Sequence, residues 1–243
     1  MIVAGTLFLF IQSITLTNMQ SITPSIGQLM ASAGELPEIC TLPNQEDPII
    51  IETTVDRVVD GDTARFFLEG RSVPMRFLNI DTPETNYQGH EQPKWGAAAK
   101  NELSRVLKGG DTVKLEIPGA DRCDTNGRVL GWVFKGTKNI NKHMVEKALA
   151  VNYCIFPHLD RCEELGQIVM EKESKQEGMF GDPDFVIPYE WRLLVSGRQP
   201  DKYVGSMETK EVYRPDRLTE IDPGLRVFFF KKSHIQDPWI FIE

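Results

Sequence analysis

The first 48 residues contain no lysine or arginine, although the whole chain of 243 residues holds 27 of them. The same stretch carries four acidic residues, so the formal net charge of −8 falls to −4 beyond it. This balance excludes a broad basic face, because large nucleic-acid footprints depend on many lysine and arginine contacts to phosphates. A local basic cleft remains compatible with it.

The chain also lacks, at its N-terminus, an apolar run of the ~20 residues that a membrane-spanning helix needs. The run from Ile2 to Leu16 is shorter, and Ala31-Ser32-Ala33 follows it as a small-residue cleavage site. This pattern predicts a secretory signal in residues 1–33 with cleavage after Ala33, although basic residues before the run are missing. We therefore expect a secreted or periplasmic protein. A signal anchor in the membrane is the second choice, and a disordered start is the alternative to both.

Cysteines with zinc-finger spacing are absent as well. No two of the four cysteines stand as C-x-x-C, which argues against a zinc site; they are Cys40, Cys123, Cys154 and Cys162. In an exported chain they permit two disulfides in three connectivities, one of which contains a local Cys154–Cys162 pair. Free buried thiols are the alternative.

No internal repeat and no alternation of strands with helices is visible. Turn signals and alternating apolar residues predict five strands, at 49–59, 63–68, 73–80, 112–117 and 128–134. Helical periodicity predicts three helices, from Pro93 to about 107, over 140–149 and over 159–177. Strands that cluster in this order favour an α+β fold, a small closed barrel with helices at one end.

Two flanking segments have a different character. Residues 34–48 contain proline and acids and are predicted to be a linker before the barrel domain of residues 49–192. Residues 193–243 contain two strand-like stretches, 226–231 and 239–242, and are predicted to be a β-rich appendage packed on the barrel. We find no catalytic constellation in that appendage.

Two acidic motifs, Asp60-Gly61-Asp62-Thr63 and Asp81-Thr82-Pro83-Glu84, each stand at the end or edge of a predicted strand. Hard divalent cations prefer carboxylate, carbonyl and water oxygens, so Asp62, Asp81 and the backbone carbonyl of Thr82 are the candidate ligands. Asp60 is not expected to bind the metal directly; it would orient water molecules or the backbone turn next to the ligands. Taken alone, an Asp-Gly-Asp sequence also fits a plain turn.

Three further residues are candidates for catalysis. Glu84, three residues after Asp81, is the candidate general base, with a surface glutamate as the alternative. Arg76 lies in an otherwise apolar strand and Arg128 begins another. Both are candidates for binding phosphate oxygens, because phosphoryl transfer depends on positioning and charge stabilisation. Arg128 by itself also fits a surface arginine that pairs with Asp60 or Glu84.

In this order and spacing, the motifs resemble the staphylococcal nuclease-like (thermonuclease) family. The likeness rests on residues 60–63, on Arg76 placed five residues before the 81–85 motif, and on Gly127-Arg128. It runs from about residue 53 to 192, over a little more than half of the chain. The resemblance implies an OB-fold, that is, a five-stranded barrel with three helices.

The resemblance also implies a mechanism. One Ca²⁺ ion, in preference to Mg²⁺, would be held by Asp62, Asp81 and the Thr82 carbonyl, with Glu84 as base and the two arginines on the reacting phosphate. The substrate would be DNA or RNA, hydrolysed at the 5′ P–O bond with little sequence preference. No stable protein partner is implied.

This chain departs from the family pattern at the nucleotide pocket. A tyrosine is common before the Gly-Arg pair, where this chain has Asn126, and two pocket tyrosines are expected where it offers only Tyr153 and Phe156. Stacking of a base on an aromatic ring contributes about 1–3 kcal/mol. We therefore expect altered nucleotide affinity and unaltered metal and phosphate chemistry.

Two other functions compete with a nuclease. A non-catalytic OB-fold module that binds nucleic acid would lack the ligand set, which is complete here. A secreted interaction protein would place its function in residues 193–243.

Overall fold

The computed structural model describes residues 36–243, and the predicted signal in residues 1–33 lies outside them. None of the helices in this described part combines the length and the apolar character that a membrane crossing requires. Short 3₁₀ turns occur at Glu38–Cys40, Gly178–Gly181, Pro215–Glu220, Pro223–Leu225 and Lys232–His234.

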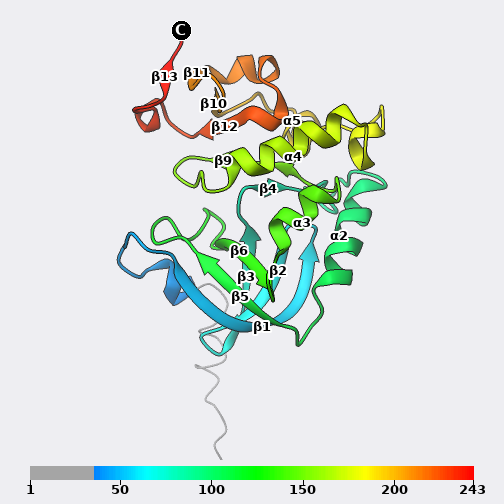
Figure 1. The fold of residues 1–243 in the computed structure, drawn as a ribbon, viewed down its shortest axis with the longest axis vertical. Helices are drawn as coiled ribbons and strands as arrows, with labels where there is room; N and C mark the ends of the chain where they lie inside the picture. The colour runs from blue at the N-terminus through cyan, green and yellow to red at the C-terminus, as the bar shows by residue number, and fades with distance from the viewer. Residues whose placement is uncertain (1–35) are drawn as a thin grey trace, which may run out of the picture. The chain divides into compact units, whose positions relative to one another are not determined.

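A closed five-stranded barrel forms the first half of the described chain, as the strand pattern predicts. Its strands are β1 (Ile49–Asp60), β2 (Thr63–Leu68), β3 (Arg71–Phe77), β5 (Thr112–Ile117) and β6 (Val129–Lys135). They pair in the order β3-β2-β1-β5-β6, and a parallel pairing of β3 with β6 closes the barrel (Figure 1). The short β7 (Lys138–Asn139) extends β6, and β4 (Ile80–Asp81) pairs with β8 (Val151–Asn152).

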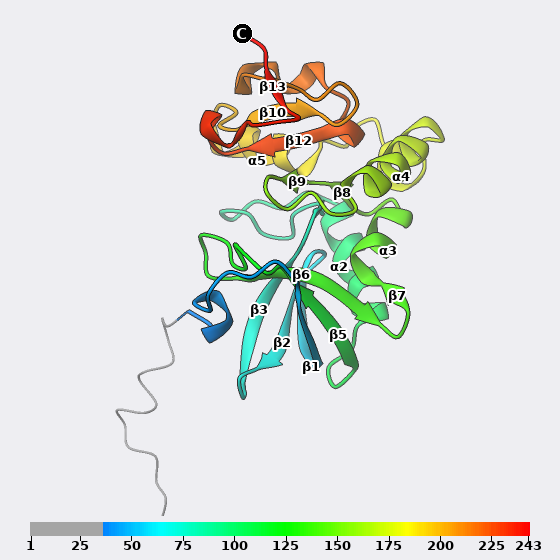
Figure 2. The ribbon, with the colours of Figure 1, turned by 60° about the vertical axis from the view of Figure 1, so that its left-hand side comes forward.

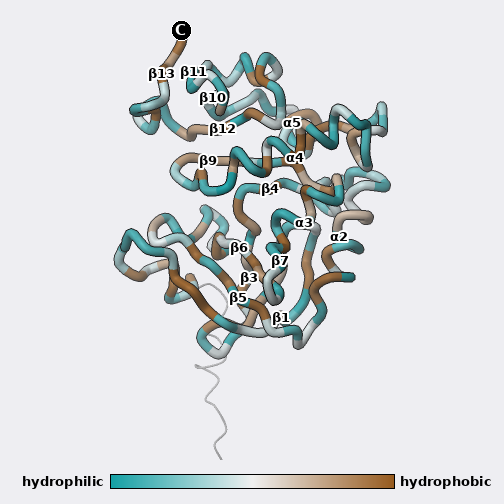
Figure 3. Tube along the Cα trace, viewed as in Figure 1, coloured by the Kyte–Doolittle hydropathy of each residue, from teal (hydrophilic) through white to brown (hydrophobic). Residues whose placement is uncertain are grey.

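Every second side chain of the barrel strands points inward and fills the barrel. On β3, Val73, Met75 and Phe77 are buried in the core, whereas Arg76 between them points to the other face. The same core takes in Phe66 and Trp132, and hydrophobic stretches follow the barrel strands in Figure 3. Because side chains alternate between the two faces of β3, Arg76 faces away from the core.

Three predicted helices are present: α2 (Trp95–Val106), α3 (Ile140–Glu146) and α4 (Cys162–Ser174). On α2, Ala99 and Leu103 are buried on the face turned to the barrel, and α2 and α3 cover one side of it in Figure 2. A further helix, α5 (Pro188–Ser196), begins at a proline, which suits the first helical turn.

The chain after α5 builds a second sheet. Its strands are β10 (Tyr203–Ser206), β11 (Glu211–Tyr213), β12 (Arg226–Phe229) and β13 (Ile240–Phe241), joined by β9 (Cys154–Ile155) from the preceding half. β12 runs parallel to β9, with Val227 opposite Cys154, and the Phe156 amide donates to the Phe228 carbonyl at 2.9 Å. The C-terminal strands are therefore hydrogen-bonded to the segment that directly follows β8 (Figures 1 and 2).

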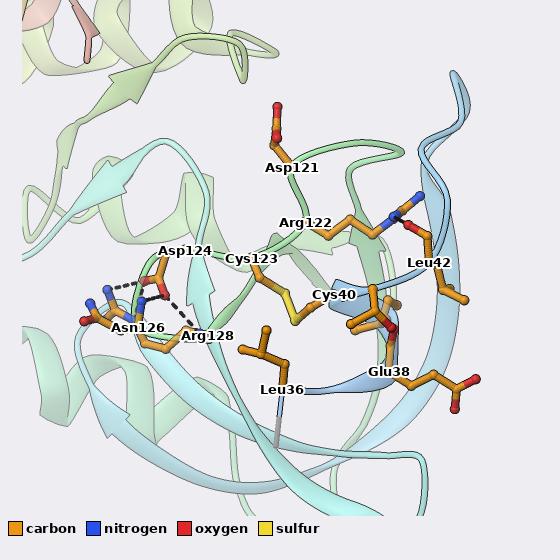
Figure 4. The surroundings of a disulfide bond; sticks show 12 residues. Leu36, Glu38, Cys40, Leu42, Asp121, Arg122, Cys123, Asp124, Asn126 and Arg128 are labelled. Carbon is orange, nitrogen blue, oxygen red and sulfur yellow. Dashed lines mark hydrogen bonds and ion pairs between the residues drawn. A yellow bond between two sulfur atoms is a disulfide. The ribbon is translucent and has the colours of Figure 1, made fainter. Parts of the chain in front are cut away.

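The segment predicted to be a linker is attached to the barrel over its described part. The Glu69 carboxylate accepts the backbone amides of Glu38 and Ile39, at 3.0 and 2.9 Å, and Ile39 is buried in the barrel core. A disulfide joins Cys40 to Cys123 in the loop before β6 (Figure 4), and a second joins Cys154 to Cys162. Two disulfides, and not free thiols, are thus present.

Candidate active site

The two acidic motifs lie side by side although the second begins 18 positions after the end of the first. Thr63 pairs with Arg76 across the β2–β3 hairpin, and the Phe77 amide donates to the Asp62 carbonyl at 2.8 Å. The Asp62 carboxylate in turn accepts the amide and the hydroxyl of Thr82, each at 2.9 Å. The hairpin therefore folds the first motif back against the second.

Gly61 permits this close approach. A Cβ atom at that position would lie 2.6 Å from the Thr82 hydroxyl and 2.8 Å from the Ala99 Cβ, closer than such atoms tolerate. The glycine between Asp60 and Asp62 therefore has a packing role. Asp60 accepts the Gly61 amide at 2.7 Å, and its burial, followed by the charge of Asp62, raises the pKa of its carboxyl group.

Arg76 connects the two carboxylates predicted as metal ligands. One of its terminal nitrogens lies 2.7 Å from Asp62 Oδ2 and the other 2.8 Å from Asp81 Oδ1. The Asp81 side chain is almost completely buried, so its charge requires partners. The structure thus brings Asp62, Arg76, Asp81 and Thr82 together, as the spacing of the motifs predicts.

Glu84 is held by the loop that connects β4 to α2. The Glu84 amide donates to the side chain of Gln92 at 3.2 Å, and the Gln92 amide donates to the Glu84 carbonyl at 2.8 Å. Burial, and after it the neighbouring Asp81 charge, raises the pKa of the Glu84 carboxyl to about 7. A carboxyl group with this pKa is suited to accept a proton near neutral pH.

Arg128 is paired with Asp124 at the tip of the loop before β6, and not with Asp60 or Glu84. Its guanidinium lies 2.7 Å from Asp124 Oδ2, and Asp124 Oδ1 accepts the amides of Asn126 and Arg128, each at 2.9 Å (Figure 4). These bonds fix the loop and leave the exposed Asn126 beside the arginine. The Cys40–Cys123 disulfide anchors the same loop one residue earlier.

Arg192 on α5 is a residue that sequence reasoning did not assign to the site. It contacts both carboxylate oxygens of Asp81, at 3.0 and 2.8 Å, and Glu84 Oε1 at 2.6 Å. The sequence placed it only within the predicted barrel domain of residues 49–192. Its partners lie more than 100 positions away, which no local pattern reveals.

The two predicted pocket aromatics pack against the C-terminal part of the chain. The Tyr153 ring lies 5.7 Å from that of Tyr189 and 5.1 Å from that of Phe228. Its burial raises the pKa of the phenol well above the usual value. The Phe156 ring stacks on Phe229 at 5.6 Å. Both rings still border the cleft, but much of their surface is covered by side chains of the same protein.

The side chains of the site surround one cleft of about 1080 Å³. Every side chain predicted for the site borders it except those of Asp81 and Thr82, which lie beneath: its walls include Asp60, Asp62, Arg76, Glu84, Asn126, Arg128, Tyr153 and Phe156. The arrangement places carboxylates and arginines on a common surface, where they can bind a phosphate group and activate a water molecule.

The donor set suits a hard cation. Within residues 36–243, no group of three or more His, Cys, Asp or Glu side chains is placed to hold a metal ion. Two carboxylates are present, Asp62 and Asp81, and backbone, water and phosphate oxygens would complete such a site. Asp60 and Glu84 lie nearby, and the guanidiniums of Arg76 and Arg192 contact the two carboxylates.

Comparison with known proteins agrees with this geometry. Residues 74–181 match the model of a family described as "Staphylococcal nuclease homologue". The chain belongs to the staphylococcal nuclease-like family. The matched residues include Arg76, the second acidic motif and Arg128, whereas the first motif and α5 lie outside the match.

Several relatives of the chain bear names of endonucleases. Endonuclease YhcR of Bacillus subtilis is 32% identical over 197 residues, which cover 76% of this chain and 16% of the relative. The SPbeta prophage-derived endonuclease YokF of the same organism is 28% identical over 56% of this chain and 46% of its own length. An uncharacterized endonuclease of Escherichia coli is 29% identical over 58% of this chain and 85% of its own. The chain thus spans less than half the length of the first two relatives.

Proposed function

We propose that the protein is a calcium-dependent nuclease that hydrolyses phosphodiester bonds of DNA and RNA with little sequence preference. The observation that carries the proposal is the common cleft in which Asp62, Arg76, Glu84 and Arg128 meet. The family membership and the relatives named endonucleases support it further. A binding module without catalysis would not require a buried carboxylate pair beside a raised-pKa glutamate.

The residues of the cleft divide the chemistry among them. Arg76 and Arg128 donate hydrogen bonds to the non-bridging oxygens of the scissile phosphate, where negative charge increases in the transition state. Glu84 takes a proton from a water molecule whose oxygen attacks the phosphorus. The bond from phosphorus to the 5′ oxygen breaks, so the products are a 3′-phosphate and, after the leaving oxygen takes up a proton from solvent, a 5′-hydroxyl.

Asp62, Asp81 and the Thr82 carbonyl would hold the calcium ion. When bound, such an ion neutralises charge on the phosphate and orients the attacking water. Asp60 supports this arrangement from behind, through its hydrogen bond to the Gly61 amide. Arg192 contributes a further positive charge at Asp81.

The test is digestion of single-stranded DNA and of RNA by the purified protein, with Ca²⁺ and then with EDTA, followed by identification of the product ends. We expect cleavage with Ca²⁺, loss of cleavage with EDTA, and 3′-phosphate ends. A protein that is folded by circular dichroism, binds the oligonucleotide and leaves it intact with Ca²⁺ would instead be a binding module.

We also propose export from the cytoplasm, with cleavage of the signal after Ala33. Two disulfides among residues 36–243 support an oxidising compartment. N-terminal sequencing of the protein recovered from the periplasm or medium tests this; an intact Met1 in the cytoplasmic fraction would contradict it.

A further inference from the structure

The wall of the cleft that faces the barrel comes from the C-terminal part of the chain. Arg198, Lys202 and Phe230 line the same cleft as Arg76 and Arg128. All three lie beyond residue 181, where the match to the nuclease family model ends. Neither the family match nor the acidic motifs assign a role to this wall.

Arg198 is a cation at the rim of this wall. Its guanidinium donates to the Tyr87 hydroxyl at 2.9 Å and to the Ser196 hydroxyl at 3.0 Å. Within residues 36–243 it has no carboxylate partner at ion-pair distance, unlike Arg76, Arg128 and Arg192. Its charge is therefore available to an anion in the cleft, next to the loop that carries Glu84.

Phe230 presents an aromatic ring on the same wall. Its side chain is 53% exposed although it directly follows the buried strand β12. The Lys202 ammonium lies 5.5 Å from the centroid of this ring and 4.6 Å from that of Tyr189, at cation–π distance. Lys202 is itself largely buried, which lowers the pKa of its ammonium group, and it pairs with Asp201 at 2.8 Å.

The rings of Tyr153 and Phe156, in contrast, are engaged inside the protein. Tyr153 packs on Tyr189 and Phe228, and Phe156 stacks on Phe229. A base that stacked on either ring would have to share it with these neighbours. Phe230 is the ring in the cleft whose surface is most open to a ligand.

We propose that Arg198, Lys202 and Phe230 form a binding site for the single-stranded nucleic acid next to the scissile bond, with Arg198 on a phosphate and Phe230 stacked on a base. This proposal rests on the nuclease function proposed above and specifies the strand state of its substrate. An aromatic ring beside cations is the usual composition of single-strand sites.

An unpaired strand fits this wall better than a duplex does. In a duplex the base faces are stacked on one another, so a base can lie on Phe230 only where the strand is unpaired. DNA and RNA share this chemistry, and separate arms of the experiment distinguish them.

The test uses the Glu84→Gln variant, which is expected to cut the strand about 10²-fold or more slowly than wild type. Its affinity is measured for fluorescein-labelled 15-mers of dT and of U and for a duplex. We expect Phe230→Ala in this background to weaken single-strand binding about tenfold, the scale of one lost base stack. Phe230→Trp should keep the affinity and Phe230→Leu should lose it. Arg198→Ala should lower the slope of log K against log salt concentration by about 0.7, the value for one phosphate contact on a single strand.

Two matched controls lie outside the cleft. Phe67 on β2 is 48% exposed and Arg57 on β1 is 62% exposed, and neither borders the site. Phe67→Ala and Arg57→Ala should bind like the parent. If Phe230→Ala and Arg198→Ala also do so, or if the duplex binds as tightly as the single strands, the proposal is overturned.

These outcomes are distinct from failure of the nuclease itself. If the wild-type protein cleaves and Phe230→Ala does not weaken binding, the nuclease function is supported and this binding site is refuted. If the wild-type protein does not cleave and Phe230→Ala weakens binding, the binding site is supported and the nuclease function is refuted.

Discussion

At the level of single residues, the buried carboxylate of Asp81 is the point where two arginines of the site meet. Asp81 is 1% exposed and is contacted by Arg76 from β3 and by Arg192 from α5, which is itself 14% exposed. A buried carboxylate is tolerated only when cations or donors surround it. The two arginines therefore link the barrel to α5 through one acidic side chain.

Arg192→Gln should lower the free energy of unfolding by about 3 kcal/mol, because it leaves Asp81 and Glu84 buried with fewer partners. Urea denaturation in EDTA measures this. Arg57→Gln is the control, since the Arg57–Asp56 pair is exposed and such pairs contribute about 0–1 kcal/mol. Equal small losses in the two variants would show that the Arg192 bonds do not stabilise the fold.

The sequence allowed Asp62, Asp81, Arg76, Glu84 and Arg128 to be predicted as members of one site, because they lie in short motifs with fixed offsets, and the structure places them around one cleft. It did not reveal the partner of Arg128 or any role for Arg192. Asp124 is four residues from Arg128 and fits a turn signal, so that pair was within reach of local reasoning. The contacts of Arg192 arise only when α5 packs on the barrel.

At the scale of elements, α2 and the loop of residues 82–92 fit together closely at Gly96. A Cβ atom at Gly96 would lie 2.3 Å from the Glu84 carbonyl oxygen. Gly96 lies in the first turn of α2, so this contact positions the loop that presents Glu84. Helix α2 and the loop that carries Glu84 are thus in close contact at one glycine.

Gly96→Ala should destabilise the protein by about 1–3 kcal/mol through this overlap and should lower the cleavage rate, because Glu84 must shift. Ala97→Gly, at the exposed neighbouring position, should cost about 1 kcal/mol from helix propensity alone and leave the rate unchanged. Urea unfolding and cleavage assays compare the two. A more stable Gly96→Ala protein would refute the contact, since alanine is otherwise favoured in a helix.

The elements with strong local periodicity were predictable. Strand β5 (Thr112–Ile117) has the predicted bounds, and α2 has the predicted buried face. Helix α5 was not predicted, because it is nine residues long and offers little periodic signal. The parallel pairing of β12 with β9 joins segments about 70 residues apart, and strand patterns do not encode such partners.

At the scale of the whole described chain, the Cys40–Cys123 disulfide closes the longest covalent loop. It spans 83 positions and ties the segment before β1 to the loop that carries Arg128 (Figure 4). The Cys154–Cys162 disulfide spans 8 positions. A cross-link stabilises mainly by restricting the unfolded chain, and more so for longer loops.

Cys40→Ser/Cys123→Ser should lower the unfolding free energy by about 4 kcal/mol, against about 2–3 kcal/mol for Cys154→Ser/Cys162→Ser. Guanidinium denaturation of both double variants gives the comparison. A larger loss of unfolding free energy in Cys154→Ser/Cys162→Ser would show that restriction of the unfolded chain does not determine the stabilisation.

We propose that the two acidic motifs, Arg76 and Arg128 form one hydrolytic site with Glu84 as its general base. The most direct test of this proposal is the single-turnover rate of single-stranded DNA cleavage by Glu84→Gln and wild-type protein, with Ca²⁺ present and with circular dichroism as the check of folding. We expect Glu84→Gln to cleave about 10²-fold or more slowly than wild type, the scale of losing a general base. A folded Glu84→Gln protein that cleaves at the wild-type rate would contradict it.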